Sequence, residues 1–210
     1  MIADNKIRAV CTLAICVGIV VAVFLLPSEV SKADMMAFLM KLISHTTTIS
    51  LVLIFIFDKW LWKIFPEWLL GIPKIYGTWK GKLEHTQITD TGAKQEGTVE
   101  PFFLCIRQTF CSLVIQAMSE KSDSVSTTAS LKKGPVVWDV IYAYDNAPSL
   151  EHQTNSRRHR GATVLQIKPT DKGYKLAGEY WTDRWSQGRM TLEKRNTKIV
   201  ADFAAAKKVF

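Results

Sequence analysis

The segment GEYWTDRWSQGRM, residues 178–190, carries an aromatic ring, a hydroxyl and a guanidinium at alternate positions. Strict alternation along a strand places Tyr180, Thr182 and Arg184 on one face. An aromatic ring can stack on a nucleotide base, and a guanidinium offers a fork of donors that matches phosphate oxygens. The other face of this strand carries three charges and suits solvent, so we expect the first face to point into the protein interior.

Arg184 then needs an anionic or aromatic partner, because burying an unpaired guanidinium costs several kcal/mol. One arrangement is internal: Arg184 pairs with a carboxylate of its own domain or packs across Trp79. The other is an anionic ligand, with phosphate held by Arg184, Thr182 and Arg107 of the segment FFLCIRQTF. Bases would then stack on Trp79, Trp138 and Tyr180. The residues alone leave these two arrangements open.

The sequence contains no pattern of side chains typical of catalysis. Paired carboxylates, a nucleophile elbow and a phosphate-cradling loop are all missing from it. Its four histidines lack metal-ligand spacing and its four cysteines form no CxxC pair, so we expect neither a metal nor a cofactor. These patterns predict a binding domain and not an enzyme.

The elements that carry the candidate residues are strands. The segment IYGTWKGKLEH alternates strictly, and its G-x-W resembles the opening of lipocalin-type barrels. Seven further strands are expected near 97–108, 110–119, 124–132, 136–144, 161–168, 174–183 and 188–195, with TDTG (89–92) as a turn. Eight antiparallel strands can close into a barrel that removes exposed edges. We therefore expect an all-β domain with a compact, eight-stranded, antiparallel, lipocalin-like barrel.

Two segments fall outside this strand pattern. Residues 145–160 form a long polar loop with a basic end, and such a loop is either a binding element or simply solvated. Its role stays open. The last residues, TKIVADFAAAKKVF, are expected to be helical and to cover the barrel or to lie on a membrane.

Two apolar segments precede the barrel, at about 9–26 and 35–57. Each is close to the roughly 20 residues that cross a bilayer core. A cleaved signal peptide is the other interpretation of the first segment, and the second apolar segment speaks against it. Basic residues gather before the first segment and after the second, so both termini of this hairpin are expected in the cytoplasm.

This reading divides the chain into four parts. A cytoplasmic N-terminus (1–8) leads into two transmembrane helices (9–57), a tryptophan-containing interfacial linker (58–73) and the barrel domain (74–210). The chain carries a formal charge of +8, of which residues 71–210 contribute +7, with 21 Lys and Arg against 14 Asp and Glu. Such a surface suits an anionic partner, although a merely solvated surface is an equal alternative.

The second apolar segment contains a polar stripe. Lys41, His45 and Thr48 are spaced i, i+4 and i+7, so they share one helix face. Ionisable side chains inside a membrane span usually face protein or water, because contact with lipid costs about 2.5–3.5 kcal/mol. The stripe is therefore expected to form a contact between hairpins or to line a pore, unless Lys41 simply reaches the headgroups.

The amino-terminal helices, YGTWKGKLEH and GEYWTDRWSQGRMTLEKR together resemble the CD-NTase-associated protein 15 type effectors of cyclic-oligonucleotide antiphage signalling (CBASS). The resemblance implies a barrel that binds a cyclic dinucleotide made by a partner nucleotidyltransferase, with Tyr180, Thr182 and Arg184 as ligand-binding residues. It also implies that binding promotes homo-oligomerisation, inner-membrane disruption and growth arrest, with no nucleic acid partner. Which cyclic nucleotide binds, how many subunits assemble, and whether a defined pore forms are left open.

Two alternatives belong to other classes of protein. A membrane-anchored, lipocalin-like carrier of a lipid would have an apolar cavity, with Arg184 neutralised by an internal carboxylate. A structural anchor would have a filled barrel that docks another protein.

Overall fold

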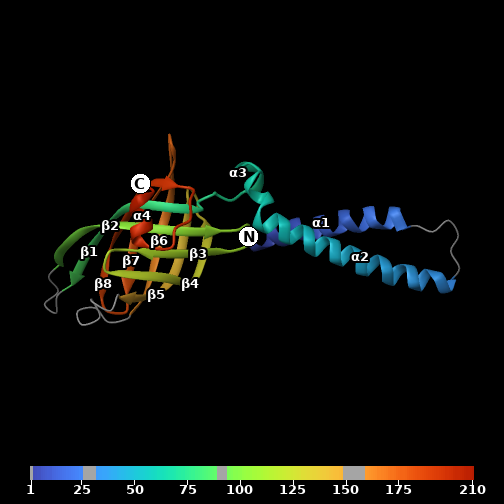
Figure 1. Ribbon diagram of the computed structural model, residues 1–210, viewed down its shortest axis with the longest axis horizontal. Coiled ribbons are helices and arrows are strands. Elements are labelled where there is room, and N and C mark those ends of the chain that lie inside the picture. Colours follow the sequence, from blue (N-terminus) through green and yellow to red (C-terminus); the bar gives the residue numbers. More distant parts are fainter. Residues whose placement is uncertain (1, 26–31, 89–93, 149–158) are drawn as a thin grey trace. The chain divides into compact units, whose positions relative to one another are not determined.

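The computed structural model describes residues 2–25, 32–88, 94–148 and 159–210 (Figure 1). The chain separates into two compact units. One consists of Met1–Gly71 together with Thr109–Cys111, and the other consists of Ile72–Gln108 together with Ser112–Phe210. The expected turn at 89–92 and most of the expected loop at 145–160 lie outside the described residues.

The first unit is helical. It contains α1 (Ile2–Leu25), α2 (Lys32–Lys59), the short 3-10 helix η1 (Leu61–Lys63) and α3 (Glu67–Leu70). Among the described residues, one helical stretch is long and apolar enough to cross a membrane, Met35–Lys59, and a shorter apolar stretch covers Ile15–Phe24. The helical character of both expected segments is thus confirmed, and one of them has the length and composition of a span.

The second unit is a closed antiparallel barrel, in which each strand pairs with the next along the chain and β8 returns to β1. This confirms the expected eight-stranded architecture. The strands are β1 (Gly77–Ile88), β2 (Lys94–Gln108), β3 (Leu113–Met118), β4 (Ser122–Lys133), β5 (Trp138–Pro148), β6 (His159–Thr170), β7 (Gly173–Thr182) and β8 (Ser186–Asn196) (Figure 1).

Alternation along each strand sends one set of side chains into the barrel. Leu104, Leu165, Leu176 and Leu192, from four different strands, are fully buried there. Complete burial of a leucine side chain contributes about 1.5–3 kcal/mol to the stability of the fold. The central part of the barrel is therefore packed with side chains.

The C-terminal helix α4 (Phe203–Lys208) builds a second, smaller core outside the barrel. Its Phe203 ring lies 5.4 Å from the ring of Phe103 on β2, and Cys105 is buried in the same cluster. Asp202 begins this helix, since its Oδ1 accepts a hydrogen bond from Ala205 N at 2.7 Å. The expected terminal helix is confirmed, and it covers the outer face of β2 and β3.

Candidate functional site

One end of the barrel interior is lined by tyrosines. Tyr142 and Tyr144 occupy alternate positions on β5, and Tyr180 lies on β7. All three are buried, and the rings of Tyr142 and Tyr144 lie 5.8 Å apart. We call this end of the barrel the tyrosine end.

Two glycines make room for these rings. A Cβ atom at Gly161 would lie 2.4 Å from the Tyr144 hydroxyl oxygen, and one at Gly188 would lie 2.6 Å from Cε1 of Tyr180. Real Cβ atoms do not approach other atoms so closely, so both positions require glycine while the rings stay in place. The tyrosine end therefore depends on glycine and tyrosine facing one another across neighbouring strands.

His85 of β1 contacts Tyr180 directly. The Tyr180 hydroxyl lies 2.6 Å from His85 Nδ1, and the two rings meet edge to face at 5.9 Å. Burial lowers the pKa of His85, while the Glu100 carboxylate opposes that shift and the Lys121 ammonium adds to it. Glu100 and Lys121 form an ion pair with each other. His85 is thus favoured in its neutral form, whose Nδ1 can accept a hydrogen bond from the Tyr180 hydroxyl.

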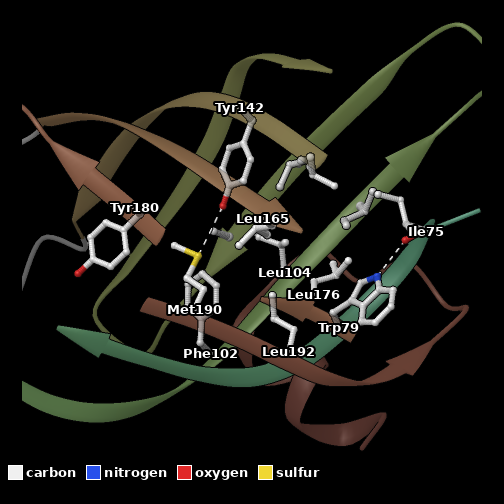
Figure 2. Close-up of a cluster of buried hydrophobic side chains, with 14 of the residues drawn as sticks. Ile75, Trp79, Phe102, Leu104, Tyr142, Leu165, Leu176, Tyr180, Met190 and Leu192 are labelled. Carbon is white, nitrogen blue, oxygen red and sulfur yellow. Dashed lines mark hydrogen bonds between the residues drawn. The ribbon is translucent and has the colours of Figure 1, made fainter. Parts of the chain in front are cut away.

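The tyrosine hydroxyls stay protonated at neutral pH. Burial, together with a lesser effect of the Glu100 carboxylate, raises the pKa of Tyr180 to about 12. Burial likewise raises the pKa of Tyr142 to about 12, with a small opposing effect from the Thr163 hydroxyl. The Tyr142 hydroxyl points to Met190 Sδ at 3.8 Å, a weak contact (Figure 2). This end of the barrel therefore contains neutral hydroxyl groups.

Thr163 of β6 lies between two of these tyrosines in the sheet. It pairs with Tyr142 on β5 and with Tyr180 on β7. Its side chain is fully buried, and its Oγ1 lies near the Tyr142 hydroxyl, but within the described part of the chain it makes no hydrogen bond of ordinary geometry. An unsatisfied buried hydroxyl costs about 1–3 kcal/mol, so Thr163 is a group that a bound water or ligand would stabilise.

The expected inward orientation of Arg184 is wrong. β7 ends at Thr182, whose Oγ1 lies 2.6 Å from Ser186 Oγ, and residues 183–185 form the turn into β8. Trp185 N donates to Thr182 O across this turn, so the chain reverses before the alternation can turn Arg184 inward. Arg184 is exposed at the rim of the tyrosine end. Burial raises the pKa of Tyr144 above its usual range, and the nearby Arg184 guanidinium partly offsets that rise.

An open pocket of about 390 Å³ lies at this rim. Two contacts join its walls: Arg160 Nε lies 3.5 Å from Asp145 Oδ1, and Arg160 N donates to Asp183 Oδ2 at 3.1 Å. The pocket is lined by Asp145, Asn146, Ala147, His159, Arg160 and Asp183. It thus combines acceptors with a guanidinium.

The opposite end of the barrel is closed by Trp79, which is fully buried. Its Nε1 donates to Ile75 O at 2.9 Å, so the indole N–H is satisfied. The Arg195 guanidinium lies 5.6 Å from the Trp79 ring centroid and 4.9 Å from that of Tyr76. The arginine that packs across Trp79 is therefore Arg195 and not Arg184.

The structure brings together only part of the predicted set. Tyr180 and Thr182 lie on β7 with Arg184 just beyond them, whereas Figure 2 shows Trp79 and Tyr180 at opposite ends of the buried cluster. Trp138 begins β5 and is level with Leu176, well away from Tyr180. Arg107 is exposed and lies beside exposed Val114, so its uncertain direction resolves to the outside of β2.

Four residues that lie at the two ends of the barrel were not predicted from the sequence: His85, Tyr142, Tyr144 and Arg195. Continued alternation from Trp79 through Leu83 leads to His85, and alternation in WDVIYAYD leads from Trp138 to Tyr142 and Tyr144. Those signals were present in the sequence. Arg195 had no such signal, because its position over Trp79 depends on the pairing of β1 with β8.

A barrel closed at one end, with neutral hydroxyl groups and exposed guanidinium groups at the other, has the features of a receptor for a small polar or anionic ligand. Residues 70–194 match the family described as Cap15, cyclic dinucleotide receptor domain, and the chain belongs to this family.

Relatives of known name support the same assignment. A protein named CD-NTase-associated protein 15 from Staphylococcus schleiferi is 25% identical over 162 residues, which is 73% of this chain and 79% of the relative. A protein of the same name from Escherichia albertii is 27% identical over 160 residues, which is 72% of this chain and 77% of the relative. The family resemblance seen in the sequence is therefore confirmed, and the family is one of non-catalytic receptors.

Proposed function

We propose that this chain is a membrane-anchored effector of a CBASS antiphage system. Its barrel binds a cyclic dinucleotide at the tyrosine end, and binding drives homo-oligomerisation and disruption of the inner membrane, leading to growth arrest or cell death. The observation that carries the proposal is the difference between the two ends of the barrel. One end is closed by Trp79 and Arg195, and the other combines Tyr180, Thr182 and an exposed Arg184 beside an open pocket.

The proposed ligand lies over the tyrosine end and not in the middle of the barrel. Leu104, Leu165 and Leu192 fill the interior, so a dinucleotide has to remain at the rim. There, Arg184 would meet a phosphate, and the exposed Trp185 next to it would offer a ring for a base. Tyr180 and Thr182 would contribute hydroxyl groups from below.

The membrane part of the proposal rests on α1 and α2. We propose that both cross the inner membrane as a hairpin, with both termini in the cytoplasm, as the distribution of basic residues favours. The ligand must then bind the assembled state more tightly than the resting state, because a ligand of equal affinity shifts nothing. Confinement to a membrane raises the effective concentration of the helices, so a modest preference suffices.

A thermal-shift panel of cyclic di- and trinucleotides on the full chain in detergent tests this function. We expect a cyclic dinucleotide to raise the unfolding midpoint in a concentration-dependent way. Arg184→Ala should weaken binding about 10- to 100-fold, since a charge-assisted contact is worth about 1.5–3 kcal/mol. The midpoint of the unliganded protein should hardly change, because Arg184 is exposed in a turn.

Arg107→Ala is the matched control, since Arg107 is also exposed but lies on the outer face of β2. It should bind as the unmodified chain does. Normal binding by Arg184→Ala would contradict the assigned site, and a panel without any shift would contradict the function.

The structure disfavours the lipid-carrier alternative. A carrier of an acyl chain needs an empty apolar interior, whereas fully buried leucines occupy this one. The pocket at the rim is lined by polar and charged side chains, with Asp145, Arg160 and Asp183 among them. A filled structural anchor would not explain why these groups gather at one end.

A further inference from the structure

The barrel has one incompletely paired seam, between β3 and β4. β4 pairs with β5 from Ser122 to Lys133, but with β3 only over Val125–Asp123, opposite Gln116–Met118. Residues 127–133 of β4 have no ladder partner on the β3 side within the residues that the structure describes. Every other pair of neighbouring strands is joined over six or more positions.

The local geometry explains why the ladder stops. Ile115 N donates to the Ser126 hydroxyl at 2.9 Å, so a side chain takes the place of the next backbone acceptor. A bulge in the pairing with β5 follows between Ser126 and Thr128, and the β3 ladder does not resume beyond it within the described residues. The result is a seven-residue strand edge, 127–133, which we call the β4 edge.

The β4 edge is accessible and polar. Thr128, Ser130 and Lys132 point outward and are exposed, while Ala129 and Leu131 point inward and are partly buried against the core. An exposed edge presents a row of backbone donors and acceptors that another strand can pair with. Lysine and a bulge are features that keep such an edge from pairing indiscriminately.

The edge is self-complementary. When two copies are aligned antiparallel over all of residues 127–133, Ser130 lies opposite Ser130 of the second copy, and Thr128 lies opposite Lys132. Outward side chains face outward ones in this register, and the lysines of the two copies stay apart. Two identical patches that satisfy each other form a closed, two-fold interface.

We propose that the β4 edge is an interaction surface whose partner is the same edge of a second copy of this chain. Antiparallel pairing of the two edges would extend the sheet across two barrels. This inference builds on the oligomerisation in the proposed function by naming a surface for it. The pairing can be tested directly, because Thr128, Ser130 and Lys132 are exposed.

Cysteine crosslinking of the full chain in proteoliposomes tests the pairing. The background carries Cys11→Ser, Cys16→Ala and Cys111→Ser, and Cys105 stays because it is buried. Directly opposite residues on antiparallel strands have Cβ atoms about 4.5–5.5 Å apart. Ser130→Cys should therefore give several-fold more dimer with a short bifunctional thiol reagent than the control Gln166→Cys. Gln166 is also exposed, but its strand pairs on both sides, with Asp139 and Ala177.

A charge at Thr128 makes the test specific for the register. Thr128→Glu, combined with Ser130→Cys, would face Lys132 of the second copy and should raise the dimer yield. Thr128→Lys would face the same lysine and should lower it several-fold. Equal yields at positions 130 and 166, or yields that ignore the charge at position 128, would overturn the proposal.

Parallel thermal-shift measurements separate this inference from the proposed function. Suppose that a cyclic dinucleotide raises the unfolding midpoint but position 130 crosslinks no better than position 166. This result would overturn the proposed pairing of the β4 edge and leave the proposed function standing. Register-dependent crosslinking without any response to a nucleotide supports the edge and contradicts the function.

Discussion

His85 and Tyr180 form the most specific pair of side chains at the tyrosine end. Their 2.6 Å contact joins two strands, β1 and β7, that are not neighbours in the barrel. Glu100 and Lys121 are the charged groups that act on His85 from β2 and the β3–β4 turn. Tyr180, below the proposed ligand site, thus contacts a histidine whose pKa responds to the ion pair of Glu100 and Lys121.

This pair predicts a pH dependence of stability. Burial holds the pKa of His85 below its ordinary value of 6.5 in the folded state, so below that pH the unfolded chain binds more protons. The contribution of His85 to stability is therefore complete above 6.5 and is lost as the pH falls toward the folded-state pKa. The unfolding midpoint of the full chain should fall over this range, and it should fall less in His85→Gln, which keeps an acceptor for Tyr180.

The comparison of the two proteins removes the contribution of the carboxylates, which titrate in both. Identical slopes of unfolding midpoint against pH in the two proteins would contradict the role of His85.

At the scale of elements, the closed end depends on the last strand. Arg195 of β8 donates from Nε to Tyr76 O at 2.9 Å and from Nη1 to Lys74 O at 2.8 Å, so it ties β8 to the segment that leads into β1. Its guanidinium also lies over the Trp79 ring. Charge-assisted hydrogen bonds and a cation–π contact act here on one side chain.

Arg195→Ala should accordingly lower the free energy of unfolding by about 2–3 kcal/mol, since it leaves two carbonyl groups without their donor. Arg189→Ala is the matched control, because Arg189 is an exposed arginine on the same strand, and it should change stability by less than about 0.5 kcal/mol. Denaturant titration of both variants by tryptophan fluorescence measures the difference. Equal losses would show that Arg195 does not close the barrel.

The sequence predicted elements better than it predicted their ends. Period-two alternation located all eight strands, because one face of each strand must be buried. The orientation of Arg184 was predicted wrongly because side chains alternate between faces only while the strand continues. The turn at 183–185 is held by a hydrogen bond from Trp185 N to Thr182 O, which strand propensity does not reveal. Trp79 and Tyr180 were grouped as aromatic residues, but their separation depends on register.

At the scale of the whole molecule, the proposed function requires that helices respond to a ligand bound by the barrel. The polar stripe on α2 is suited to that response. His45 Nδ1 lies 2.7 Å from Lys41 O, and Thr48 Oγ1 donates to Ser44 O at 3.0 Å, so both side chains have partners within their own helix. Both are also exposed within the described chain, which leaves them available to other copies.

The double variant His45→Leu, Thr48→Leu should therefore separate binding from membrane damage. The helix loses only local contacts, so the cyclic dinucleotide should still raise the unfolding midpoint to the same extent. Dye leakage from proteoliposomes after addition of the nucleotide should fall several-fold, because leucine cannot supply the polar contacts between hairpins.

The matched control is Ile43→Leu with Leu51→Ile, which changes exposed apolar positions of the same helix without changing its polarity. It should leak as the unmodified chain does. Unchanged leakage in the His45 and Thr48 variant would exclude the stripe from the active assembly. If leakage and nucleotide binding are lost together, the two side chains are instead needed for the helical unit to fold.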